Sequence, residues 1–165
     1  MQRIQMSEFS VYLQQRPGEL AGVLDAAKAA GVRISSISTT EYQDRGCVRL
    51  LGTPEQSLRL MCESLVDAGI GPIVEAPVVG VSVENRPGMI RDLSVLMADN
   101  RINIRYCYLI PSADGIDGTV CVLRFDEHDR AMDLIDAADW PIAEQLDELD
   151  ADLDSDSESA GESAA

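Results

Sequence analysis

The stretch of sequence that decides the fold occurs twice. Ser10-Val-Tyr-Leu-Gln-Gln-Arg-Pro-Gly-Glu-Leu20 aligns with Gly80-Val-Ser-Val-Glu-Asn-Arg-Pro-Gly-Met-Ile90 at an offset of 70 residues, so the tripeptide Arg-Pro-Gly recurs. Before each tripeptide, apolar and polar residues alternate, as expected of a β-strand with one buried face. After it, apolar residues recur at helical spacing. The repeated stretch therefore predicts a strand, a tight loop and a helix at two places.

Three further blocks keep the same order and extend the repeat. Residues 31–34, 48–50 and 72–75 align with residues 101–104, 123–125 and 141–144 at offsets of 70, 75 and 69. Four blocks in one order predict two homologous modules, at residues 8–77 and 78–146. A strand at 73–76 runs almost directly into the strand at 79–83, so we expect no flexible linker between the modules.

Each module is predicted to follow the order strand, helix, strand, strand, helix, strand. Strands are expected at 9–13, 34–40, 47–51 and 73–76, and at 79–83, 104–110, 119–125 and 140–142; helices follow Pro17, Pro54, Pro87 and Asp126. The βαββαβ order predicts an α+β fold of two ferredoxin-like modules, each an antiparallel sheet with its helices on one face. The sheets leave a face and edges partly uncovered, which predicts a homo-oligomer.

Charge and hydropathy narrow the class of protein. The chain has 165 residues, a net charge of -16 and 45% apolar residues, which excludes wholesale disorder. Residues 147–165 are acidic and without apolar periodicity, so they are predicted to form a disordered tail. Nucleic acid is an unfavourable partner for such a chain. A membrane partner is not expected either, because there is no long apolar run and no apolar signal segment; we predict a cytoplasmic protein.

The inventory of reactive side chains argues against an enzyme. The four cysteines form no CxxC pair, and His128 is the single histidine, so neither a metal site nor a nucleophile–histidine relay is expected. No glycine-rich phosphate loop or other cofactor motif is present, and no catalytic residue or cofactor is predicted. Tyr106 and Tyr108 are interpreted as sheet packing, and Arg49 and Arg124 as solvent-facing charges.

The second repeat also carries a family resemblance. Val83-Glu-Asn-Arg-Pro-Gly-Met-Ile90, followed by Asn100-Arg-Ile-Asn-Ile-Arg-Tyr106, resembles the signature of the ACT domain, a small ligand-binding regulatory module. Both modules carry it, and the chain is similar to stand-alone tandem ACT proteins, which have no catalytic domain. The resemblance implies that an amino acid binds at the interface of two modules, near the first strand-to-helix loop, and acts allosterically.

The candidate site residues lie in these loops and in the first turns of the helices that follow. Glycine lets a ligand approach the backbone, and a helix N-terminus favours a carboxylate. The candidates are Gln15, Gly18, Glu19 and Leu20 in the first module and Asn85, Gly88, Met89, Ile90 and Asn103 in the second. The resemblance implies ligand contacts for the Asn85 and Asn103 side chains. Gln15 and Arg33 replace them in the first module, which leaves open whether that module keeps a working site.

The sequence thus predicts a non-catalytic regulatory protein that binds a small amino acid, or a related carboxylic acid, and relays its presence to a partner. One alternative is a regulatory subunit of an amino-acid biosynthetic enzyme such as acetolactate synthase, although the clear repeat argues against that example. Another is an assembly scaffold without a ligand, in which Arg-Pro-Gly is only a helix start. The sequence does not identify the amino acid.

Overall fold

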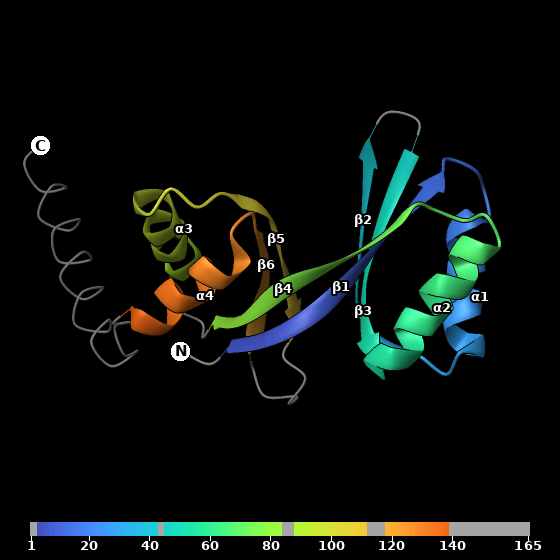
Figure 1. The fold of residues 1–165 in the computed structure, drawn as a ribbon, viewed down its shortest axis with the longest axis horizontal. Helices are drawn as coiled ribbons and strands as arrows, with labels where there is room; N and C mark the ends of the chain where they lie inside the picture. Colours follow the sequence, from blue (N-terminus) through green and yellow to red (C-terminus); the bar gives the residue numbers. More distant parts are fainter. Residues whose placement is uncertain (1–2, 43–44, 84–87, 112–117, 139–165) are drawn as a thin grey trace, which may run out of the picture.

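The computed structural model describes residues 3–42, 45–83, 88–111 and 118–138 (Figure 1). Along the chain these residues form β1 (Arg3–Gln14), α1 (Glu19–Ala29), β2 (Arg33–Tyr42), β3 (Arg45–Thr53), α2 (Glu55–Asp67), β4 (Ile73–Val83), α3 (Met89–Asp99), β5 (Ile104–Pro111), β6 (Thr119–Phe125) and α4 (His128–Ala137). The mixed α+β class and the helix positions predicted from the repeat are confirmed.

The described strands form one sheet with the order β2-β3-β1-β4-β6-β5, and every neighbouring pair is antiparallel. Figure 1 shows α1 and α2 at one end of the molecule, α3 and α4 at the other, and the strands between them. The long strands β1 and β4 run through the middle and join the two ends. Two ferredoxin-like modules are therefore combined in a single sheet.

The junction between the modules is a continuous strand. The sequence predicted separate strands at 73–76 and 79–83, but β4 runs unbroken from Ile73 to Val83. Its first half pairs with β1 on one side, from Ile73 opposite Val11 to Ala76 opposite Glu8. Its second half pairs with β6 as well. The modules therefore share this strand. Pro77 lies opposite Ser7 of β1 and before Val79, where the pairing with β6 begins, so its missing backbone N–H removes no hydrogen bond between β4 and β6.

The strand β1 is longer than predicted and contributes to both modules. It begins at Arg3 rather than near Phe9, and its residues 3–7 pair with residues 77–81 of β4. This is the place beside β4 that the fourth strand of the second module takes in a ferredoxin-like sheet. The guanidinium group of Arg3 pairs with the carboxylate of Asp136 on α4, which fastens this half of β1 to the second module. The strand predicted at 140–142 lies outside the described residues.

The helix-facing side of the sheet carries two separate apolar cores. The first lies under α1 and α2 and includes Phe9, Val11, Leu50, Leu58 and Leu65; the second lies under α3 and α4 and includes Val79, Leu93, Met97, Leu123 and Ile135. Each module thus buries its own apolar face. In the described part of the chain, no helix combines the length and the hydropathy needed to cross a bilayer.

The helix-free side of the sheet is shared by both modules. Leu51, Val78 and Val122 are buried there, from β3, β4 and β6. Tyr108 of β5 hydrogen-bonds Glu8 of β1 although β4 and β6 lie between these strands. In a flat sheet, three strand spacings would separate them by about 14 Å. The helix-free side is therefore concave, and the two halves of the sheet close over it.

Candidate ligand-binding site

The loop between β1 and α1 ends in a glycine whose backbone conformation other residues rarely adopt. Gly18 has φ 93° and occupies the N-cap position of α1, and Gly88 has φ 87° at the same place before α3. Among the described residues, a Cβ atom at either position would meet nothing within 4 Å, so the backbone is open on that side. No side chain of the described part of the chain caps either helix, so the positive end of each helix dipole faces this open space.

A cavity of about 350 Å³ lies beside this loop in the first module. That volume falls in the range of small-molecule pockets, about 300 to 1,000 Å³. Its lining comes from the end of β1, the loop, the first turn of α1, the end of β2 and the start of β3: Leu13, Gln14, Gln15, Arg16, Glu19, Leu20, Thr39, Thr40, Glu41, Gly46, Cys47 and Val48. Three predicted site residues, Gln15, Glu19 and Leu20, are thus brought together, and Gly18 lies between them in the chain.

Strand register decides which side chains face this cavity. Thr39 lies opposite Val48, and Val48 belongs to the core under α1 and α2. Because successive side chains alternate between the faces of a sheet, Thr39 and Glu41 lie on the helix side with the cavity, and Thr40 lies on the other side. Leu13 and Val48 form an apolar floor, and the exposed side chain of Leu20 adds apolar surface at the mouth.

The cavity carries charges of both signs. Arg16 is cationic, and Glu19 and Glu41 are anionic. Together with the uncapped start of α1, this set offers a carboxylate and an ammonium group separate places to bind. Among the described residues, no three His, Cys, Asp or Glu side chains are placed to hold a metal ion.

The predicted residues of the second module are placed differently. Asn85 lies outside the described residues. Met89 is 7% exposed and belongs to the core under α3 and α4, and Ile90 packs against that core, so their side chains point away from a ligand in the loop. Gly88 precedes them at the helix start. The backbone N–H of Asn103 donates to Oδ1 of Asp126 at 3.0 Å, and the backbone carbonyl of Asn103 accepts from the backbone N–H of Asp126, which fixes the backbone before β5.

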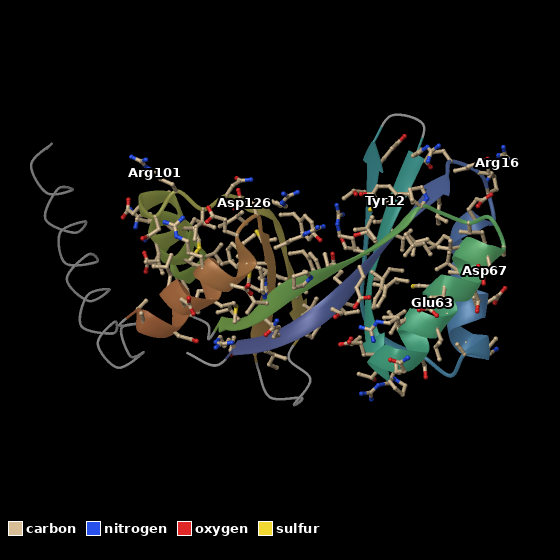
Figure 2. The ribbon with its side chains drawn as sticks, in the orientation of Figure 1. Tyr12, Arg16, Glu63, Asp67, Arg101 and Asp126 are labelled. Carbon is tan, nitrogen blue, oxygen red and sulfur yellow. The ribbon has the colours of Figure 1, made fainter. Side chains whose placement is uncertain are left out.

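Gly88 and Asn103 lie at opposite ends of α3. A helix of 11 residues is about 16 Å long, so one amino acid cannot touch both within the same module. Arg33, at the equivalent position in the first module, pairs with Thr53 at the end of β2 away from the cavity. Figure 2 shows Arg16 and Arg101 at opposite ends of the molecule, with Asp126 on the side of Arg101. A site that uses Gly88 or Gly18 together with Asn103 would need a second copy of the chain.

A second cavity of about 300 Å³ lies between α2, β1 and β4, lined by Phe9, Arg59, Cys62, Glu63, Val66, Asp67, Ile73 and Glu75. Figure 2 shows Glu63 and Asp67 on α2 at this end of the molecule. Arg59 pairs with Glu75 at 2.5 Å and with Glu55 at 2.8 Å, and its hydrogen bond lowers the pKa of Glu75. Arg59, the one cation among the described residues that line this cavity, is therefore already paired with carboxylates, which disfavours an anionic ligand here.

Several cavity residues were not predicted from the sequence. Thr39, Glu41, Gly46 and Val48 come from the β2–β3 hairpin, which was predicted as a hairpin but not as part of the site. The missing signal was the strand register: Leu13 pairs with Gly46, which brings the hairpin end beside the loop at the end of β1.

Comparisons with known proteins agree with this fold. The sequence matches the family model described as an ACT domain pair over residues 4–149. A similar solved structure is protein BT0572 from Bacteroides thetaiotaomicron, with a TM-score of 0.67 and 19% identity over 81% of this chain and 88% of that chain. Another is the ligand-free regulatory subunit of aspartate kinase from Thermus thermophilus, with a TM-score of 0.59 and 15% identity over 82% of this chain and 95% of that chain.

At these identities the solved structures show likeness of fold alone. No curated protein matches the sequence significantly. The family model, in contrast, spans both modules and most of the chain. The chain therefore belongs to the family of ACT domain pairs.

Proposed function

We propose that this protein is a non-catalytic sensor that binds a small amino acid in the cavity of its first module and relays binding to another protein. The observation that carries the proposal is the cavity itself, which lies at the strand-to-helix loop of a regulatory amino-acid-binding family. The loop position is the one predicted from the repeated Arg-Pro-Gly. The cavity also supports a working site in the first module, although Gln15 and Arg33 depart from the family residues there.

The charges suggest how an amino acid would be oriented. The ligand carboxylate lies against the start of α1, where the helix dipole and Arg16 both favour a negative charge. Glu19 and Glu41 offer acceptors to the ammonium group. The ligand side chain then packs on Leu13, Leu20 and Val48, which favours a small aliphatic group.

The partner belongs to one of two classes. An enzyme whose activity changes with the amino acid fits a separate regulatory protein, and a second copy of the chain would bring an Asn103 to a loop glycine. A permanent regulatory subunit is the rival, and the aspartate kinase regulatory subunit shows that such a subunit can have this fold. Co-purification with a catalytic chain after washing in high salt would favour the permanent subunit.

A melting-temperature screen against the twenty amino acids tests the proposal, with two matched variants. Leu20 lines the cavity and is 38% exposed; Leu60 on α2 is 52% exposed and lies outside both cavities. In Leu20→Glu, the new charge is favourable to the helix start but repels a carboxylate, so the melting shift should disappear. Leu60→Glu should keep the wild-type response.

A ligand at one hundred times its Kd stabilises the folded state by about 2.7 kcal/mol, which a melting curve resolves easily. Equal shifts in wild type, Leu20→Glu and Leu60→Glu would place the ligand elsewhere. No shift with any amino acid would favour the scaffold alternative.

A further inference from the structure

A buried carboxylate lies on the helix-free side of the sheet, between the two modules. Glu8 of β1 is 0% exposed. It accepts a hydrogen bond from the hydroxyl of Tyr106 at Oε1 and another from Tyr108 at Oε2, the latter at 2.5 Å. Both tyrosines belong to β5 of the second module. A carboxylate without such partners would be costly to bury, so these hydrogen bonds hold the two halves of the sheet together.

Both tyrosine hydroxyls keep their protons and can donate hydrogen bonds over a wide pH range. Burial, followed by the hydrogen bond to Glu8, raises the pKa of Tyr106 and of Tyr108. The two residues differ in their other neighbours. The guanidinium groups of Arg49 and Arg124 lie over the ring of Tyr106, whereas Tyr108 also contacts Ser36 of β2.

Arg49 connects this buried group to the first module. Its guanidinium carbon is 4.3 Å from the centre of the Tyr106 ring, and its Nε is 3.9 Å from Oε1 of Glu8. Its Nη1 donates to Oγ1 of Thr40 at 3.0 Å. The Arg49 side chain is 16% exposed, so the sequence-based interpretation of Arg49 as a solvent-facing charge is wrong. Tyr106 and Tyr108 pack in the sheet as interpreted from the sequence, and their hydroxyls also donate hydrogen bonds to Glu8.

The far end of this chain of contacts is the wall of the ligand cavity. Thr40 belongs to the cavity lining, and its neighbours Thr39 and Glu41 face the cavity. Cys47 and Val48 of β3 form the adjoining wall and directly precede Arg49. The two strands that enclose the cavity on their helix side therefore carry the Arg49–Thr40 hydrogen bond on their reverse side.

The Arg49 side chain has a second arrangement within reach. Its Nε is buried and has no hydrogen-bond partner among the described residues, and it lies 3.9 Å from Oε1 of Glu8, which accepts from Tyr106. Loss of the Tyr106 hydrogen bond would leave this buried carboxylate less well satisfied, so that it attracts the Arg49 guanidinium group more strongly. An unsatisfied buried donor favours a small shift that would satisfy it. A shift of the guanidinium group toward Glu8 would draw Nη1 away from Thr40.

We propose that Arg49 is a positioning residue of the cavity. Through it, Tyr106 and Glu8 at the module interface control how firmly the β2–β3 hairpin is held as a wall of the cavity. While Tyr106 hydrogen-bonds Oε1 of Glu8, this carboxylate is well satisfied and Nη1 of Arg49 stays on Thr40, which holds the β2–β3 hairpin. When this hydrogen bond is absent, the carboxylate attracts Arg49 more strongly, Nη1 leaves Thr40 and the hairpin loosens. The expected effect on ligand binding rests on the function proposed above, but the coupling of Arg49 to the β2–β3 hairpin does not.

Two variants on β5, each of which removes one tyrosine hydroxyl, distinguish this coupling from general destabilisation. Tyr106→Phe keeps the ring under Arg49 but frees Oε1, the oxygen nearest to Arg49. Tyr108→Phe also removes one hydrogen bond to Glu8, but it frees Oε2 and leaves Arg49 in place. Both variants should lose similar stability in urea unfolding. Only the first should loosen the cavity wall.

The readout is amide hydrogen exchange of the ligand-free protein. In Tyr106→Phe, exchange at residues 39–42 and 46–48 should accelerate by roughly two- to thirtyfold, the range of coupling along packed networks. In Tyr108→Phe, faster exchange should be confined to the surroundings of Ser36 and β5. In an Arg49→Met background, Tyr106→Phe should have no further effect on residues 39–42. Equal protection of these residues in wild type and Tyr106→Phe, or equal loss in both tyrosine variants, would overturn the proposal.

Melting temperatures of the same proteins, measured with each of the twenty amino acids in turn, test the effect on ligand binding. An amino acid that raises the wild-type melting temperature should do so less in Tyr106→Phe and equally well in Tyr108→Phe. An equal response in both variants would contradict the coupling. If none acts on wild type, the proposed function fails, and the exchange comparison alone still decides whether Arg49 links the modules.

Discussion

The two sides of the sheet are built on different principles. On the helix side, each module encloses its own apolar core, and the two cores share no residue. On the helix-free side the described residues of both modules share one surface, which carries the cluster of Leu51, Val78 and Val122 and the buried carboxylate of Glu8. A change on the helix side should therefore act within one module. A change on the helix-free side should act on how the modules are joined.

The largest expected effect comes from removing the shared carboxylate. Glu8→Ala leaves two part-buried tyrosine hydroxyls without their acceptor and Arg49 without its nearby counter-charge. We expect a loss of about 3 to 5 kcal/mol, as for breaking a buried ion pair. Glu75→Ala is the matched control, because Glu75 lies one position from Glu8 in the register of the same β1–β4 pair, opposite Phe9, but is partly exposed and pairs with Arg59. It should cost at most about 1 kcal/mol. Urea unfolding measures both, and equal losses would remove the distinction between the two sides.

The next effect tests whether each helix-side core belongs to one module. Leu58→Ala in the first core and Leu93→Ala in the second should each cost about 2 to 5 kcal/mol, because both leucines are almost fully buried. Native-state hydrogen exchange should show lost protection mainly in α1 and α2 for Leu58→Ala, and in α3 and α4 for Leu93→Ala. Uniform loss across both modules in either variant would mean that the two cores unfold as one unit.

A smaller effect comes from a buried thiol in each core. Burial raises the pKa of Cys62 to about 11 and that of Cys121 to about 12. A group whose pKa is raised by folding binds its proton more tightly in the folded state, so its contribution to stability is complete below the unfolded pKa near 9 and falls as the pH rises. At pH 10 the free energy of unfolding should therefore be about 1 kcal/mol lower per thiol than below pH 8.

The control is the corresponding alanine variant. Cys62→Ala and Cys121→Ala should each flatten the decline of unfolding free energy between pH 8 and pH 10. A decline of unchanged slope in both variants would show that other groups cause it.

The smallest expected effect is at acid pH. The hydrogen bond from Arg59 lowers the pKa of Glu75, so the ionised carboxylate stabilises the fold above its unfolded pKa, and this contribution is lost as the pH falls through the lowered value. Because both side chains are partly exposed, the effect should be a few tenths of a kcal/mol and should weaken in high salt. Glu75→Gln should therefore have a smaller salt dependence of its unfolding free energy at pH 7 than wild type. A salt dependence unchanged in Glu75→Gln would contradict this assignment.

The helix side of the molecule was largely predictable from the sequence. Period-two strands and helical spacing placed the residues of both cores, and Pro54 marked the start of α2. The repeated tripeptide located the strand-to-helix loop beside the cavity. These features are local, and alternation or helical spacing expresses them directly.

The helix-free side was not predictable in the same way. In the sequence, Glu8 is a polar residue directly before the strand predicted at 9–13. With Gln5 and Ser7 also polar, the apolar pattern of that strand did not predict that β1 begins at Arg3. The hydroxyls that satisfy Glu8 lie 98 and 100 residues away in the chain. Only the curvature of the sheet brings them together, and no short-range pattern encodes it. Likewise, the hairpin residues of the cavity follow from strand register.

The most direct test of the proposed amino-acid site is a map of backbone chemical shifts. The amino acid with the largest melting shift is titrated into isotopically labelled protein, and amide signals are followed by NMR. We expect the largest changes at residues 15–20, 39–42 and 45–48, around the cavity of the first module. Saturable changes confined to other residues, or no saturable change at all, would contradict a ligand site at this loop.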